Sequence, residues 1–196
     1  MKKYIKMKKI AIFASGSGSN AENIADYFKG NKEVGICAIL TNKSDAYVLK
    51  RAEKLGIPSL VFDRNDFVNS GKILDYLKDL NIDGIILAGF LWKIPVDLIN
   101  AFPDRIVNIH PALLPAYGGK GMYGMNIHKA VIENKEKESG ITIHLVNEEY
   151  DKGAILVQAR TSISATDSPE DLAQKIHELE YSYFPVAIES WLNGLK

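Results

Sequence analysis

Short apolar runs alternate with longer amphipathic segments along nearly the whole chain. The apolar runs predict seven strands, at residues 9–14, 34–41, 59–62, 82–88, 106–109, 140–145 and 154–160. Apolar residues at helical spacing predict six helices, at residues 20–29, 47–55, 70–80, 96–101, 127–134 and 169–193. Strands separated by helices form βαβ units, which build a parallel sheet with helices on both faces. The pattern therefore predicts an α/β fold with a Rossmann-like, doubly wound, mostly parallel sheet.

Only the last two predicted strands have no helix between them. The residues that join them, 148–153, favour a turn, so we expect one antiparallel edge. Ligands of such sheets bind at the carboxyl ends of the strands. We expect the strands that end near Ile109 and Leu145 to present those ends to one crevice.

A polar pair at the end of the fifth predicted strand carries candidate chemistry. Asn108 and His110 are two residues apart, so both side chains point to one face of an extended strand. A carboxamide can stabilise an oxyanion, and an imidazole can move a proton. Asp151 is a candidate for the carboxylate that polarises His110. The alternatives are a strand end capped by polar residues and, for Asp151, a solvated loop.

A Gly-rich loop follows the first predicted strand and precedes a helix. Backbone N–H groups and the helix dipole at such an entry, here Ser15–Asn20, bind phosphate. With Ala21 the spacing also fits the loose dinucleotide pattern, but the second strand ends in Thr41, Asn42 and Lys43, without the acid that a ribose requires. We therefore expect a single phosphate, with a tight packing turn as the alternative.

Length and composition limit the number of domains and the kinds of partner that the protein can have. A length of 196 residues suits one domain. Residues 1–8 are interpreted as a basic tail, because the apolar run after them is too short for a signal peptide or a membrane span. The 24 basic and 24 acidic residues balance, which argues against a nucleic-acid surface. The single cysteine, Cys37, excludes a disulfide framework, and no spacing resembles a metal site. We expect a cytoplasmic protein that binds small molecules, with no nucleic-acid or membrane partner.

From residue 10 to about residue 195 the chain resembles the phosphoribosylglycinamide formyltransferases of purine biosynthesis. The matching stretches are Ser15–Asn20, Leu87–Phe90, Asn108–Pro115, Gly140–His144 and Asp151–Gly153. The resemblance implies a transferase enzyme of one formyltransferase domain, residues 1–196. Its expected reaction transfers a formyl group from 10-formyltetrahydrofolate, the co-substrate, to the amine of 5′-phosphoribosylglycinamide, without a metal.

The resemblance also implies roles for individual residues. The catalytic set is Asn108, His110 and Asp151. The residues expected to bind the ribonucleotide are Gly18, Ser19, Asn20, Gly89, Pro111, His177 and Glu180, of which the first three hold the phosphate and Glu180 the ribose hydroxyls. The residues expected to bind folate are Leu91, Trp92, Lys93, Ile94, Asn108, Asn147, Glu148, Glu149, Tyr150 and Asp151.

The chain departs from the family pattern at two places. Many members have an arginine where this chain has Trp92, so aromatic packing or Lys93 is expected to replace that contact with folate. The Gly-rich segment 117–124 is longer than in many relatives and is interpreted either as a mobile lid or as a surface loop without a role. His144 is expected to be a satisfied core histidine, with a place beside the site as the alternative, and His128 is not expected to act.

Three other functions remain open at this point. Formyltetrahydrofolate hydrolase shares the Asn-His-Asp set but is expected to carry an N-terminal regulatory domain. Methionyl-tRNA formyltransferase is expected to need a C-terminal module and a basic surface. A non-catalytic nucleotide-binding Rossmann module is disfavoured by the missing acid after the second strand.

Overall fold

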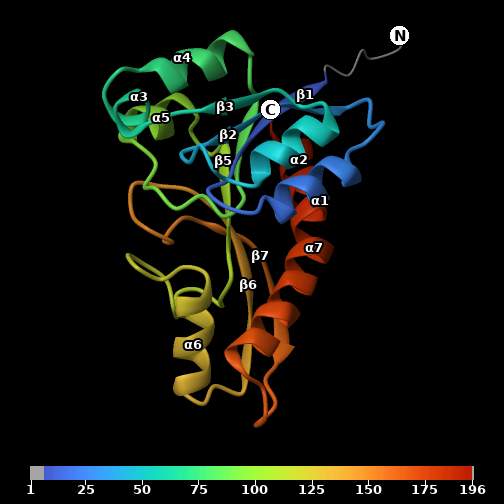
Figure 1. The fold of residues 1–196 in the computed structure, drawn as a ribbon, viewed down its shortest axis with the longest axis vertical. Coiled ribbons are helices and arrows are strands. Elements are labelled where there is room, and N and C mark those ends of the chain that lie inside the picture. Colours follow the sequence, from blue (N-terminus) through green and yellow to red (C-terminus); the bar gives the residue numbers. More distant parts are fainter. Residues whose placement is uncertain (1–6, 196) are drawn as a thin grey trace. The chain divides into compact units, whose positions relative to one another are not determined.

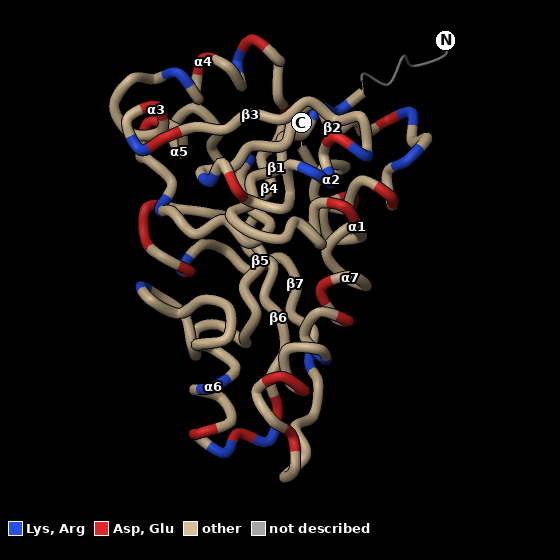
Figure 2. Tube along the Cα trace, in the orientation of Figure 1, with Lys and Arg blue, Asp and Glu red and all other residues tan. Residues whose placement is uncertain are grey.

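The computed structural model describes residues 7–195, which divide into two compact units, one reaching to Ile106 and one starting at Val107 (Figure 1). The predicted basic tail, residues 1–8, lies outside the described residues except for Met7 and Lys8, and Lys8 already begins the first strand. Acidic and basic residues are interspersed along both units (Figure 2). Within residues 7–195 no helix has the length and apolar character needed to cross a membrane.

The first unit holds four parallel strands in the order β3-β2-β1-β4. Their bounds are β1 Lys8–Phe13, β2 Val34–Thr41, β3 Ser59–Val61 and β4 Gly84–Leu87. The helices are α1 Ser19–Tyr27, α2 Val48–Leu55, α3 Arg64–Val68, α4 Lys72–Asp79 and α5 Val96–Ala101. Residues 10–13 of β1 are fully buried, because a central parallel strand is covered on both faces. The core of this unit therefore forms around β1.

The second unit holds three antiparallel strands in the order β5-β6-β7. Their bounds are β5 Ile106–His110, β6 Glu138–Leu145 and β7 Ile155–Ser162, and the helices are α6 Met125–Glu133 and α7 Pro169–Gly194. Helix α7 packs against β6, β7 and α6. Its start is fixed by a capping box, in which Ser168 and Asp171 satisfy each other's backbone N–H groups.

The predicted α/β class, with a mostly parallel seven-stranded sheet and an antiparallel edge, is confirmed. The antiparallel edge includes more than the last two strands: β6 runs antiparallel to β5 as well as to β7. A long connection that contains a helix is compatible with either strand direction, so local patterning does not decide it. The single-domain organisation over residues 1–196 stays a prediction.

Helix α3 was missed by the sequence analysis. It spans only five residues, Arg64–Val68, which is too short for a helical period to show. The signal that was available is its cap: the Asp63 side chain accepts a hydrogen bond from the Asp66 N–H at 2.8 Å.

Candidate active site

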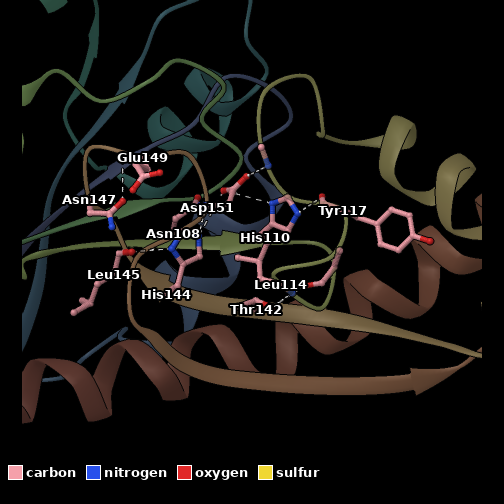
Figure 3. Close-up of polar contacts among 12 residues, drawn as sticks. Asn108, His110, Leu114, Tyr117, Thr142, His144, Leu145, Asn147, Glu149 and Asp151 are labelled. Carbon is pink, nitrogen blue, oxygen red and sulfur yellow. Dashed lines mark hydrogen bonds and ion pairs between the residues drawn. The ribbon is translucent and has the colours of Figure 1, made fainter.

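Strand pairing in the second unit places three polar side chains on one face. Asn108 lies opposite His144, and His110 lies opposite Thr142, in the register of β5 with β6. Residues directly opposite in an antiparallel pair share a face, as do residues two apart on one strand. Asn108, His110 and His144 therefore project together, as Figure 3 shows.

The turn between β6 and β7 brings Asp151 to these side chains. Its Oδ1 lies 3.7 Å from Nδ1 of His110 and 3.7 Å from Nε2 of His144. Asp151 itself has a positive φ of 55°. Two residues later, a Cβ on Gly153 would lie 1.7 Å from the Leu145 carbonyl oxygen, so the turn can pass this close to β6 only with glycine at position 153. The sequence and the turn geometry together place a carboxylate between two imidazoles.

Asp151 lies beside His110, but the predicted reason, that the carboxyl ends of the strands at 106–109 and 140–145 meet at one crevice, was wrong. Because β5 and β6 are antiparallel, Leu145 at the carboxyl end of β6 pairs with Val107 near the start of β5. The two carboxyl ends therefore point in opposite directions along the sheet. It is the turn after Leu145 that carries Asp151 to His110.

The imidazole of His110 is held in a defined tautomer. Its Nε2 lies 2.8 Å from the Tyr117 carbonyl oxygen, and since a carbonyl only accepts, Nε2 must carry the hydrogen. Nδ1, which faces Asp151, is therefore the atom that gains or loses a proton. Burial lowers the pKa of His110, although the charge of Asp151 and the bond to Tyr117 act in the opposite direction.

The amide of Asn108 is oriented by His144. Nδ1 of His144 lies 2.7 Å from the Leu145 carbonyl oxygen and must donate to it, so in the neutral ring Nε2 accepts from the Asn108 amide at 3.1 Å. One N–H of Asn108 remains for another acceptor. His144 is buried, as expected for a core histidine, and it also belongs to this group, which is the alternative that the sequence analysis left open and that the strand register supports.

The carboxyl group of Asp151 remains ionised more readily than an ordinary aspartate. Burial alone would raise its pKa, but the interaction with His144, the Gly119 N–H at 2.8 Å and the charge of His110 together lower it. The backbone of segment 117–124 thus contacts both His110 and Asp151. Sequence reasoning missed these two contacts, because backbone groups carry no residue signature.

In the first unit, the Gly-rich loop enters α1 without a side-chain cap. Gly18 is the N-cap residue with a φ of 74°, and a Cβ there would lie 2.3 Å from Cγ2 of Val48. Packing against α2 therefore requires glycine at position 18. A tight packing turn is the alternative that the sequence analysis gave for this loop. Gly18 has no side chain to cap α1, and the first turn of a helix is a place where backbone N–H groups suit an anion.

Ser15 links this loop to the ends of two other strands. Its hydroxyl donates to Oδ1 of Asn42 at 2.7 Å and accepts from the Leu91 N–H at 3.0 Å, and its N–H donates to the Gly89 carbonyl at 3.0 Å. Asn42 occupies the place where a dinucleotide site has its ribose-binding acid, and here its side chain supports Ser15. The single-phosphate role of this loop stays a prediction.

Trp92 packs against the aromatic side chains of its own unit. Its ring centroid lies 6.0 Å from those of Phe62 and Phe67 and 6.4 Å from that of Phe90, and the Arg64 guanidinium stands over the indole at 5.2 Å. Such edge and cation–π contacts stabilise a cluster beyond simple burial. Aromatic packing at this position is thus observed within the protein.

Trp92→Arg is expected to lower the free energy of unfolding by about 1 kcal/mol or more. The substitution removes the indole from Phe62 and Phe67 and places a second guanidinium beside Arg64. Urea unfolding measures the effect. The double variant Trp92→Arg, Arg64→Met should recover part of the loss, because the two like charges no longer face each other. Wild-type stability of Trp92→Arg would contradict the packing role.

The remaining predicted residues are spread over both units. Gly89 and segment 91–94 lie in the first unit, where Leu91 and Lys93 are exposed and Ile94 is buried. Pro111 and segment 147–150 lie in the second, where the Glu149 N–H donates to Oδ1 of Asn147 at 3.0 Å. Segment 147–150 is exposed. Within the second unit the structure brings together Asn108, His110 and Asp151 of the predicted set.

Helix α7 presents a second polar pair in the second unit. Nδ1 of His177 lies 3.0 Å from Oε2 of Glu180, a bond that raises the pKa of His177. Glu180 is buried, and its charge also acts on the buried His128 of α6, whose pKa is lowered mainly by burial. His128, which was not expected to act, is thus within electrostatic range of Glu180 and His177. In residues 7–195 no group of three or more His, Cys, Asp or Glu side chains is arranged to hold a metal.

Comparison with known proteins gives consistent matches. A family model described as formyl transferase matches residues 8–188. The chain is 44% identical over 183 residues to the chloroplastic phosphoribosylglycinamide formyltransferase of Arabidopsis thaliana, covering 90% of this chain and 63% of that protein. It is 39% identical over 193 residues to the phosphoribosylglycinamide formyltransferase of Haemophilus influenzae, covering 96% of this chain and 89% of that protein.

A solved structure extends the match to three dimensions. Glycinamide ribonucleotide transformylase 1 from Symbiobacterium toebii superposes with a TM-score of 0.89 at 30% identity, covering 99% of this chain and 92% of that one. Against the two plant relatives, the chain spans 63% and 61% of their length.

Proposed function

The chain belongs to the formyl transferase family, and we propose that it transfers the formyl group of 10-formyltetrahydrofolate to the amine of 5′-phosphoribosylglycinamide in de novo purine biosynthesis. The observation that carries this proposal is the cluster formed by Asn108 and His110 on one face of β5 and Asp151 in the turn between β6 and β7. Relatives named for this activity cover most of the chain.

Formyl transfer requires stabilisation of a tetrahedral centre whose oxygen becomes anionic when the amine attacks the formyl carbon. Asn108 supplies one N–H, because the other is bound to His144. His110 supplies positive charge when protonated, and the carboxylate of Asp151 favours that form. Both groups are held before reaction, so little reorganisation is needed.

The amine also loses a proton, which must reach the departing N10 of the folate. Nδ1 of His110 is the titrating atom and lies on the side of Asp151. We propose that the proton passes through His110 or through a water held by Asp151. No covalent enzyme intermediate is required, and Cys37 in β2 takes no part.

Substrate binding is assigned by family resemblance. We propose that the Gly18, Ser19 and Asn20 loop holds the phosphate and that Glu180, oriented by His177, holds the ribose hydroxyls, with Gly89 and Pro111 as further contacts. Residues 91–94 and 147–151 are proposed to bind the folate. We further propose that residues 1–196 act as a single formyltransferase domain in a reducing cytoplasm, without a metal or a nucleic-acid partner.

A steady-state assay with 10-formyltetrahydrofolate, with and without the ribonucleotide, tests the proposal. We expect the deformylated folate to form only when the ribonucleotide is present, with one formylated product for each folate consumed. Formate release without the ribonucleotide would instead identify a hydrolase, and folate binding without turnover would identify a binding module.

A further inference from the structure

Helix α2 donates hydrogen bonds to two consecutive carbonyl groups of the Gly-rich loop. The Val48 N–H donates to the Gly16 carbonyl at 3.1 Å, and Nε of Arg51 donates to the Ser17 carbonyl at 2.9 Å. The next residue, Gly18, approaches Val48 so closely that a Cβ would not fit. Three successive loop residues are thus set against one face of α2.

The Arg51 side chain is fixed by contacts in addition to this bond. Its Nη1 pairs with Oε2 of Glu22 on α1, and its guanidinium stands 5.2 Å from the Tyr47 ring centroid. The side chain is 24% exposed, so solvent weakens these contacts only in part. A guanidinium has donors in a rigid fork that can serve a carbonyl and a carboxylate together, which a lysine ammonium cannot match.

The orientation of these carbonyls determines where the loop N–H groups point. A peptide unit is planar and trans, so its N–H points away from the direction of its C=O. Because the Ser17 carbonyl faces Arg51, the Gly18 N–H points away from α2, and because the Gly16 carbonyl faces Val48, the Ser17 N–H does the same. Adjacent N–H groups that point to one side form an anion-binding backbone concavity.

We propose that Arg51 is a positioning residue for the substrate phosphate: by binding the Ser17 carbonyl, it directs the Gly18 N–H towards the phosphate. This inference rests on the proposed function, in which the loop holds that phosphate. Arg51 is paired with Glu22, which offsets part of its positive charge, so we assign its contribution to the geometry of the loop.

Three variants separate geometry from charge. Arg51→Met is expected to raise KM for the ribonucleotide about 10-fold, with kcat and KM for folate within about twofold, because the loss affects binding of one ligand only. Arg51→Lys keeps the charge but not the fork and should resemble Arg51→Met. Lys54→Met is the matched control, since Lys54 lies on the same helix, 3.5 Å from the same Glu22, with its side chain 77% exposed. Lys54→Met should leave kcat, KM for the ribonucleotide and KM for folate unchanged.

Titration with inorganic phosphate provides a readout that does not need turnover. In the wild type, phosphate should shift the backbone amide resonances of Ser17 and Gly18, and in Arg51→Lys the same titration should need about 10-fold more phosphate. If the wild type binds phosphate at these amides but shows no formyl transfer, the proposed function fails while this inference stands. The proposed role of Arg51 would be overturned by any of three results. These are wild-type phosphate affinity in Arg51→Lys, a rise of KM for the ribonucleotide in Lys54→Met equal to that in Arg51→Met, and no amide shift when phosphate is added to the wild type.

Discussion

His110→Ala is expected to lower kcat by about 10²-fold or more and to leave KM for both substrates within a few-fold. The imidazole acts on charge and on a proton that appear only after the substrates are bound, so its loss affects the transition state more than binding. Steady-state kinetics with each substrate varied in turn measures this split.

A second His110 variant separates proton transfer from hydrogen bonding. In His110→Gln, the amide can still donate to the Tyr117 carbonyl, the partner of Nε2 in the wild type, but it cannot carry a proton. We expect the same loss in kcat as for His110→Ala. Near-normal turnover of His110→Gln would exclude a protonated His110 from the mechanism.

Asp151→Asn is expected to lower kcat by about 10²-fold and to change its pH dependence. The Asn side chain retains the shape and an oxygen that accepts from the Gly119 N–H, but it loses the charge that faces His110. That charge raises the pKa of His110 against the effect of burial, so its removal lowers the pKa further. Since the protonated ring stabilises the oxyanion, the fall in kcat with rising pH should begin at a lower pH in Asp151→Asn.

Profiles of kcat against pH for wild type and Asp151→Asn test this shift. The groups that face His110 are Asp151 and His144, so a matched profile of His144→Gln shows how much of the change comes from the neighbouring imidazole. His144 acts on His110 with the opposite sign, so removing it should move the same limb to higher pH. A profile of Asp151→Asn that coincides with the wild type would contradict the proposed coupling.

Local patterning was sufficient to locate most elements. The strand at 34–41 and the helix at 96–101 were predicted with the bounds that the structure has, because an apolar run or an amphipathic period depends only on neighbours in the chain. Asn108 and His110 were assigned to one face for the same reason, since the two-residue period of a strand is local. The resemblance to a family added roles for residues whose positions patterning alone does not connect.

The sequence by itself therefore determined the α/β class, the position of the polar pair on β5 and the Gly-rich entry to α1, because each depends on short-range backbone geometry. The tertiary structure alone decided the antiparallel direction of β6, the pairing of Asn108 with His144 and the approach of Asp151 to His110. It also revealed the bond from Arg51 to the Ser17 carbonyl. These features join residues 32 to 41 positions apart in the chain, and a slip in the register of β5 against β6 would separate the active-site residues, so they depend on tertiary contacts that no local period encodes.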